Sequence, residues 1–406
     1  MSMMTAARCR IVQVFVRLGR KLHPIRKQHL ETGAGAVFAV GQLLRDMRLK
    51  KPMVVIGPGE QLTRFKLLHA LDDDAVEYQV WDQLPDVPTV DDGERISLAW
   101  AGSGCDCFIA LGSGPVLDVT KAAAARCACR SRSIMGMVGV RRIHGRRLPP
   151  VIAAPTAAGS GAEALGAAVL TDQARNIFVI EDEALMPAVA LLDPDLLADA
   201  PRDKVADAGL DCLCRTVEAF LAASHGDSRT KKLSAEAAEY LFTCLEPCWN
   251  SGGTVKERAD LLSASRMAGW AASGVGSGYA RALIRAAQTV CGLELRTACA
   301  VILPAVLEKY GGNATEQLAL LAVLADVAEG GSREERAGAL IDRIRSMVFR
   351  LGLPDMLEGV TADQAAEIAD MAAATANPRY ISPVVWTAED CLDLVLGVCA
   401  PPDGES

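Results

Sequence analysis

Histidine is scarce in this 406-residue sequence and absent beyond residue 225. The five histidines are His23, His29, His69, His144 and His225. A metal site beyond that point would have to rely on aspartate, glutamate or cysteine ligands. The sequence also lacks an uninterrupted run of 18 apolar residues, which argues against a membrane-spanning helix. The net charge of -8 argues against a nucleic-acid-binding surface.

Cysteine is frequent, but the spacing of common metal and redox motifs is missing. The chain has 13 cysteines and no Cys-x-x-Cys pair, so neither a zinc ribbon nor a thioredoxin-like site is expected. Most cysteines stand among apolar residues, which favours small buried side chains in a reducing, cytoplasmic protein. Residues 1–27 mix arginines with apolar residues but lack the apolar core and cleavage site of a targeting peptide. We therefore expect an amphipathic helix there, lying on the domain.

Short β-branched runs alternate with helical segments in the first half of the chain. Strands are predicted near residues 53–56, 107–111 and 150–154, and a helix over 35–49. This alternation predicts a doubly wound parallel α/β sheet. Beyond residue 195 only helical periodicity remains, with N-cap signals at Ser332, Thr361 and Thr387. We therefore predict an α/β domain over 1–200, an all-α domain over 201–400 and a disordered tail over 401–406.

Two glycine-bearing turns follow predicted strands, at Gly112-Ser113-Gly114 and at Thr156 to Ser160. The first opens a helix, so its backbone N–H groups and the helix dipole favour a pyrophosphate there. A plain strand-to-helix turn would also explain each motif by itself. Ligands of parallel sheets bind at the carboxyl ends of the strands, which is where both turns lie.

Order and spacing of the motifs give a more specific prediction. The segment Ala110 to Lys121, Ala-Leu-Gly-Ser-Gly-Pro-Val-Leu-Asp-Val-Thr-Lys, resembles Ala-Leu-Gly-Gly-Gly-Ser-Pro-Ile-Asp-x-Ala-Lys of the iron-dependent alcohol dehydrogenase family. Residues 155–163 and 278–285 resemble its Pro-Thr-Thr-Ala-Gly-Thr-Gly-Ser-Glu and Gly-Tyr-Val-His-Ala-Ile-Ala-His motifs. The resemblance implies a fold like that of dehydroquinate synthase, with a dinucleotide-binding α/β domain, a helical domain and a cleft between them. It also implies a homo-oligomer that uses NAD or NADP.

The resemblance assigns the nucleotide to the two glycine turns and to the end of the first strand. The cofactor-binding residues it implies are Gly57, Gly112, Ser113, Gly114, Asp118, Thr156 and Ser160. Gly57 stands where the family has the acidic residue that distinguishes NAD from NADP. Because a glycine leaves room at the adenine ribose, we expect that NADPH is not strongly excluded.

The residues at the family's metal site differ from those of the family. The family's metal ligands are one aspartate and three histidines, and by this alignment the corresponding residues here are Asp211, Arg215, Arg281 and Leu295. Arg285 stands where the family has a further active-site histidine. A guanidinium group has no lone pair to give and repels a cation, so no metal is expected.

The arginines allow two interpretations. A buried helix over residues 208–220 carries Asp211, Arg215 and Glu218 on one face, so the charges could form a salt-bridge network that fills an abandoned metal site. Alternatively Arg215, Arg281 and Arg285 bind an anion, since arginine suits forked recognition of carboxylate or phosphate. We favour an anion-binding cleft.

Three functions then remain open. The first is a metal-independent NAD(P)-linked oxidoreductase acting on a small aldehyde, ketone or alcohol with an anionic group. In this oxidoreductase a guanidinium group would replace the metal as electrophile. Tyr279 is a candidate proton donor only because of its position in the sequence. The second is a lyase, isomerase or cyclase that acts on an anionic substrate. The third is a non-catalytic binding protein.

Overall fold

Six parallel strands form the sheet predicted for the first half of the chain. In this computed structural model, which describes residues 3–22, 28–143, 145–223, 227–273 and 275–400, all pairings within that sheet are parallel. In sheet order the strands are β1 (His29–Thr32), β9 (Val189–Leu192), β6 (Val151–Pro155), β4 (Cys107–Gly112), β2 (Pro52–Ile56) and β3 (Gln79–Trp81). β2, β4, β6 and β9 are completely buried, as expected for central strands that are apolar on both faces.

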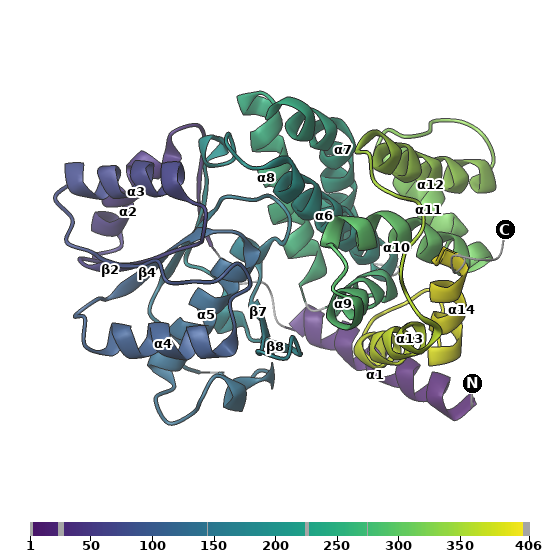
Figure 1. The fold of residues 1–406 in the computed structure, drawn as a ribbon, viewed down its shortest axis with the longest axis horizontal. Helices are drawn as coiled ribbons and strands as arrows, with labels where there is room; N and C mark the ends of the chain where they lie inside the picture. Colours follow the sequence, from purple (N-terminus) through teal and green to yellow (C-terminus); the bar gives the residue numbers. More distant parts are fainter. Residues whose placement is uncertain (1–2, 23–27, 144, 224–226, 274, 401–406) are drawn as a thin grey trace. The chain divides into compact units, whose positions relative to one another are not determined.

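Helices cover both faces of this sheet (Figure 1). The helices α2 (Val40–Asp46) and α3 (Gln61–Asp73) lie on one side of it, and α4 (Val90–Ala101) and α5 (Gly114–Ala128) on the other. The helix predicted over 35–49 is shorter, because a 3-10 turn over Ala36–Ala39 precedes α2. The doubly wound α/β fold predicted from the sequence is confirmed.

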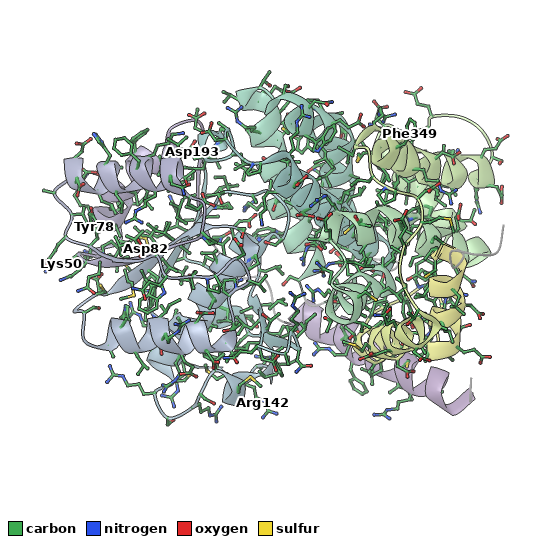
Figure 2. The ribbon with its side chains drawn as sticks, in the orientation of Figure 1. Lys50, Tyr78, Asp82, Arg142, Asp193 and Phe349 are labelled. Atoms are coloured by element: carbon green, nitrogen blue, oxygen red, sulfur yellow. The ribbon has the colours of Figure 1, made fainter. Side chains whose placement is uncertain are left out.

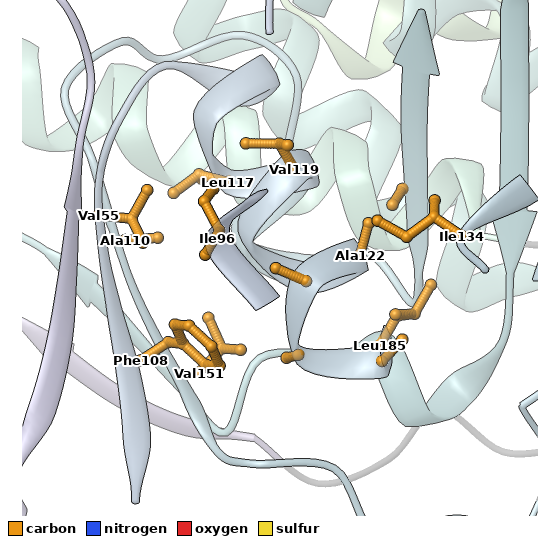
Figure 3. Close-up of a cluster of buried hydrophobic side chains, with 14 of the residues drawn as sticks. Val55, Ile96, Phe108, Ala110, Leu117, Val119, Ala122, Ile134, Val151 and Leu185 are labelled. Atoms are coloured by element: carbon orange, nitrogen blue, oxygen red, sulfur yellow. The ribbon is translucent and has the colours of Figure 1, made fainter. Parts of the chain in front are cut away.

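A second, three-stranded sheet was not predicted. It consists of β5 (Gly139–Val140), β8 (Ile177–Glu181) and β7 (Ala167–Thr171), in that order. The α/β core includes Ala168 and Leu170 of β7 and Ile180 of β8. Figure 3 shows part of this cluster. Phe108 and Ala110 of β4, Ile96 of α4, Leu117 of α5 and Ile134 are all inaccessible or nearly so. This packing fixes α5, whose first turn contains the Gly112-Ser113-Gly114 motif.

Asp193 directly follows β9, and its side chain connects the end of that strand to the turn after β1 (Figure 2). Its buried carboxylate accepts hydrogen bonds from the backbone N–H groups of Gly35 at 3.1 Å, Val37 at 3.0 Å and Asp195 at 2.9 Å. A buried carboxylate needs such donors, because desolvation otherwise disfavours the charge.

The second half of the chain is helical, as predicted. The helices are α6 (Arg202–Ala222), α7 (Ser228–Ser251), α8 (Val255–Ala272), α9 (Tyr279–Cys291), α10 (Leu295–Tyr310), α11 (Thr315–Leu324), α12 (Arg333–Arg350), α13 (Ala362–Ala376) and α14 (Ala388–Val398). Ser332, Thr361 and Thr387 each form a capping box with the residue three positions on, so the three N-cap predictions are confirmed.

The compact units of the fold differ from the predicted domains at two places. One unit comprises residues 1–24, 202–251 and 270–406, and the other comprises 25–201 and 252–269. The N-terminal helix α1 (Met3–Leu22) therefore belongs to the helical unit, where Gln13 donates to the carbonyl of Tyr380 at 2.7 Å. Most of α8 belongs to the α/β unit, because Gly161 and Gly269 let its backbone approach the Thr156 loop. Helical periodicity does not show which unit a helix packs against. The predicted tail at 401–406 lies outside the described residues.

All 13 cysteines lie among the described residues, none of them is in a disulfide, and ten are buried. Burial raises the pKa of the Cys127 and Cys391 thiols to about 12, so these side chains behave as the small hydrophobic groups predicted. Among the described residues, no helix is both long enough and apolar enough to cross a membrane.

Candidate active site

The two predicted glycine turns lie against each other in the α/β unit. A Cβ atom on Gly114 would stand 2.3 Å from the Ser160 Oγ, and one on Gly112 would stand 2.9 Å from the Val116 Cβ. Gly112 has φ 155°, in the region that favours glycine. Ser113 begins α5 as an N-cap residue with extended backbone. These close approaches explain why both positions need glycine, and the turn lies at the N-terminus of α5, where backbone N–H groups and the helix dipole suit a pyrophosphate.

Thr156 and Ser160 use their hydroxyl groups within the α/β unit. Thr156 donates to the Glu60 Oε1 at 2.5 Å, and the Ser160 Oγ accepts the Ala162 N–H at 3.2 Å. The loop between them is supported by α8, where Ser265 accepts the Gly161 N–H at 3.2 Å and donates to Glu163 at 3.1 Å. Glu60 has no counterpart among the predicted site residues.

Asp118 has a different set of contacts from those expected of a cofactor ligand. Its buried carboxylate accepts the Val169 N–H at 3.1 Å and pairs with the Lys121 ammonium at 2.8 Å. Lys121, itself buried, also donates to the carbonyl groups of Ala162, Leu165 and Ala167. The pair thus fastens α5 to the loop after β6 and to β7. Through these contacts Asp118 supports α5, which begins at the phosphate turn.

Arg215 and Arg281 come from two helices of the helical unit and share one carboxylate. Arg215 of α6 donates to one oxygen of Asp211 at 3.3 Å, and the Arg281 Nε of α9 donates to the other at 3.2 Å. The arginines are only 7% and 5% exposed. These contacts bring Asp211, Arg215 and Arg281 together, as the family resemblance predicted.

The electrostatics of this group are dominated by the guanidinium charges. Burial would raise the pKa of Asp211, but Arg281, Arg215 and Arg285 outweigh it and lower the value to about 2. Burial and the neighbouring Arg281 lower the pKa of Arg215, while Asp211 opposes them. Burial would also lower the pKa of Arg281, but the attraction of Asp211 and Glu218 is larger and raises it. One carboxylate thus holds two buried cations, with Arg285 close enough to add to the field.

Two donors of the arginine pair have no partner. Among the described residues, the buried Arg215 Nε and Arg281 Nη2 make no hydrogen bond. A buried N–H of a charged group that lacks an acceptor costs free energy, so most such groups in folded proteins have a partner. Arg215 Nε and Arg281 Nη2 are therefore unsatisfied donors of this buried group.

Glu218 holds the start of α9 and thereby Arg281. Its two oxygens accept the backbone N–H groups of Gly278 at 3.0 Å and Arg281 at 3.1 Å. A carboxylate at a helix N-terminus interacts favourably with the helix dipole. The sequence places Glu218 on the stripe of Asp211 and Arg215, but this capping contact depends on tertiary packing.

Tyr279 does not join the arginines, and we correct its assignment as a proton donor. The ring is 1% exposed and stacks on Trp386 with centroids 4.7 Å apart. Its hydroxyl donates to the Asn377 Oδ1 at 2.8 Å and accepts the Trp386 N–H at 2.7 Å. Tyr279 and Arg281 are two residues apart on one helix, so their side chains point in different directions. Sequence proximity to Arg281 was therefore misleading.

The residues at the family's metal positions do not fit a metal ion. Arg215, Arg281 and Leu295 offer no lone pair, and both oxygens of Asp211 already face guanidinium groups. Among the described residues, no group of three or more histidine, cysteine, aspartate or glutamate side chains is arranged to hold a metal.

Comparison with known proteins decides the family. The model of the family described as "Iron-containing alcohol dehydrogenase" matches residues 28–194, and that of "Fe-containing alcohol dehydrogenase family, C-terminal" matches residues 205–396. The chain belongs to the iron-containing alcohol dehydrogenase family. Together the two models cover most of the chain, and their boundary coincides with the change from strands to helices.

Curated relatives of this iron-containing alcohol dehydrogenase family member are distant. It is 29% identical over 233 residues to a probable alcohol dehydrogenase, EutG, of Salmonella typhimurium, with 57% of this chain and 58% of that protein covered. It is 26% identical over 366 residues to 1,3-propanediol dehydrogenase of Klebsiella pneumoniae, with 86% and 92% covered. The chain spans little more than half the length of the EutG proteins of Salmonella typhimurium and Escherichia coli, 58% and 52%.

A solved structure shares the fold. Sulfoacetaldehyde reductase from Bifidobacterium kashiwanohense, in complex with NAD+, superposes with a TM-score of 0.80 at 22% identity. The match covers 92% of this chain and 97% of that one.

Proposed function

We propose that this protein is an NAD(P)-linked oxidoreductase that interconverts a small aldehyde or ketone with its alcohol, without a metal. We further propose that its substrate bears an anionic group, which Arg215, Arg281 and Arg285 bind. The observation that carries the proposal is the pair of buried, unpaired donors, Arg215 Nε and Arg281 Nη2, beside a single shared carboxylate.

The unsatisfied donors of the arginine pair support an anionic ligand. Arg215 and Arg281 share the carboxylate of Asp211, and Glu218, which also attracts Arg281, accepts two backbone N–H groups of the α9 N-terminus. Neither carboxylate accepts the buried N–H groups at Arg215 Nε and Arg281 Nη2, and unsatisfied donors on a buried charged group are costly. A carboxylate, sulfonate or phosphonate would accept the vacant donors and neutralise part of that charge.

The proposed reaction uses the glycine turns of the α/β unit for the cofactor and the arginines of the helical unit for the substrate. A bound nicotinamide supplies or accepts the hydride. In the reductive direction the carbonyl compound takes up that hydride and a proton to give the alcohol and NAD(P)+. The guanidinium groups stabilise negative charge on the carbonyl oxygen, in the role that a metal has in relatives. Arginine keeps its own proton, and Tyr279 is sequestered by Asn377 and Trp386, so the proton comes from water.

Two relatives support the choice of substrate class by their names. One matching structure is a sulfoacetaldehyde reductase in complex with NAD+. A hydroxyacid-oxoacid transhydrogenase of Caenorhabditis elegans is 32% identical over 203 residues, with 48% of this chain and 43% of that protein covered. Both names denote carbonyl substrates with an acidic group.

The test compares anionic and neutral carbonyl substrates. NADH and NADPH oxidation should be followed with matched aldehydes that carry a carboxylate, a sulfonate or no charge. We expect turnover only of the anionic members. Arg285→Ala should raise the dissociation constant of a small carboxylate by about one to two decades, because it removes a charge-assisted contact of roughly 1.5–3 kcal/mol. The control Arg345→Ala removes an arginine that pairs with Glu308 on the surface and should leave binding unchanged.

Two results would contradict the proposal in different ways. Equal turnover of charged and neutral aldehydes would refute the anion site. Conversion of an anionic substrate without any change in nicotinamide absorbance would instead establish a reaction that is not a redox reaction.

A further inference from the structure

Glu60 lies at the carboxyl edge of the large sheet, in the turn between β2 and α3. Its two carboxylate oxygens accept the hydroxyl groups of Thr156 and Thr63, each at 2.5 Å. Thr156 belongs to the loop after β6, so the Glu60 side chain is directed back over the strand ends. Although Glu60 is the N-cap residue of α3, its side chain accepts no helix N–H. Helix capping therefore does not account for its position.

The carboxylate stands beside the glycines of the phosphate turn. A Cβ atom on Gly57 would lie 3.7 Å from the Glu60 Cγ, 3.6 Å from the Gly112 Cα and 2.9 Å from a Val116 methyl group. The Gly57 N–H donates to the Leu111 carbonyl at 2.9 Å. Gly57, Gly112 and Glu60 thus share one small region where β2 and β4 end.

This region is the switch point of the sheet. From β2 the chain continues to β3 at one edge, whereas from β4 it continues to β6 on the opposite side. The helices that follow β2 and β4 leave in opposite directions, and in open α/β sheets nucleotides bind in the crevice that this opens. Glu60 follows β2, and Gly112-Ser113-Gly114 follows β4.

We infer that Glu60 accepts hydrogen bonds from the adenosine ribose hydroxyls of NAD and excludes NADP by repelling its 2′-phosphate. The inference rests on the proposed use of a nicotinamide dinucleotide. An ionised carboxylate has about four lone-pair sites, and the two threonine hydroxyls fill only two of them. A 2′-phosphate beside this carboxylate would place like charges together. On this inference Glu60, three residues after Gly57, supplies the acidic group that Gly57 lacks, and NADPH binds more weakly than the glycine alone would predict.

Equilibrium binding gives a test that does not depend on turnover. NADH and NADPH should be titrated by fluorescence, and 5′-AMP and adenosine 2′,5′-bisphosphate by calorimetry, against the full chain. We expect the unphosphorylated member of each pair to bind at least about tenfold more tightly. Glu60→Gln should reduce that preference by about tenfold, chiefly by strengthening NADPH binding. The control Glu77→Gln alters an exposed acid that pairs with Lys51 in the same unit, and it should leave the preference unchanged.

The outcomes separate this inference from the proposed function. NADH binding with an equal affinity for NADPH in the unaltered protein would overturn the role of Glu60 and leave the proposed function standing. The same holds if Glu60→Gln folds and keeps the full preference. If neither dinucleotide binds at millimolar concentration while small carboxylates still bind, both are overturned. Should Glu60→Gln not fold, the NADH to NADPH affinity ratio of the unaltered protein still decides.

Discussion

Glu218 occupies the space that a side chain on Gly278 would need. A Cβ atom on Gly278 would stand 2.3 Å from the Glu218 Oε1 and 2.7 Å from the Tyr380 Cζ, and both neighbours are buried. Gly278 is the N-cap of α9, so this contact lets the carboxylate reach the helix N-terminus. The position of Arg281 therefore depends on a glycine three residues before it.

The first prediction is that Gly278→Ala both destabilises the protein and weakens anion binding. The methyl group must displace Glu218, which loses its hydrogen bonds to Gly278 and Arg281. We expect a loss of roughly 2–4 kcal/mol in the free energy of unfolding, from overpacking and unmade buried hydrogen bonds. Urea unfolding and calorimetry with a small carboxylate measure the two effects.

Gly338→Ala is the matched control for this variant. Gly338 lies inside α12, and nothing stands within 4 Å of its Cβ position. Alanine is favoured over glycine in a helix by about 1 kcal/mol, so this variant should be slightly more stable. Equal stabilities of the two variants would contradict the role assigned to Glu218.

The second prediction concerns the shared carboxylate. Asp211→Asn removes the charge that holds Arg215 and Arg281, and leaving buried cations without a counter-charge costs about 3–5 kcal/mol. Sulfate that binds the folded arginine cluster stabilises it by mass action, so it should raise the melting temperature of the variant more than that of the unaltered protein. Thermal shift at constant ionic strength measures this.

The control for Asp211→Asn is Glu308→Gln, which removes a surface carboxylate 2.6 Å from Arg345. An exposed pair contributes about 0–1 kcal/mol, so little change is expected and no specific response to sulfate. If Asp211→Asn behaves like the control, the arginines do not depend on Asp211 for their charge balance.

The third prediction is that the purified protein contains no stoichiometric iron or zinc, and that chelators alter neither its stability nor its activity. The reason is the donor set, in which only Asp211 offers lone pairs. Arg281→His by itself should not create metal binding. The triple variant Arg215→His, Arg281→His, Leu295→His restores one aspartate and three histidines and should bind a divalent ion. Elemental analysis of the unaltered protein, Arg281→His and the triple variant measures the metal content of each. One metal ion per chain in the unaltered protein, lost together with activity on chelation, would refute metal independence.

Much of the fold could be predicted from local sequence. The central strands are apolar on both faces and end at, or within two residues of, a glycine or proline. The capping boxes at Ser332, Thr361 and Thr387 mark where helices begin. The strands β5, β7 and β8 gave no such signal, because they are short and partly exposed. Their pairing depends on the packing of β7 and β8 against α5 and its neighbours, which no local pattern records.

Parts of the candidate site were predictable from helical spacing and from the motifs of the family. Asp211 and Arg215 lie four residues apart on α6, and their ion pair follows from that spacing. The roles of Glu60 and Glu218 depend on residues far away in the sequence, Thr156 and Gly278, so spacing alone does not identify them. Tyr279 shows the opposite error, since proximity in sequence to Arg281 did not place it in the same environment.

The fourth prediction concerns alkaline pH and Tyr279. Burial raises the pKa of this phenol from 10.0 to about 12. The unfolded chain releases the proton first, so the contribution of Tyr279 to stability is complete below pH 10 and is lost as pH rises to about 12. Two pKa units correspond to about 3 kcal/mol. Tyr279→Phe has no proton to lose, so its stability should fall less than that of the unaltered protein above pH 10.

The measurement is the difference in unfolding free energy between the unaltered protein and Tyr279→Phe, taken from urea titrations at pH 8 to 11.5. At pH 8 the unaltered protein should be the more stable, because the variant leaves the Trp386 N–H and the Asn377 Oδ1 without their partner. That advantage should shrink by roughly 2 kcal/mol at pH 11.5. Tyr310 and Tyr380, whose pKa values burial also raises, are present in both proteins and cancel in the difference. Parallel stability curves would mean that Tyr279 titrates alike in the folded and unfolded chains, and its sequestration from water would then be wrong.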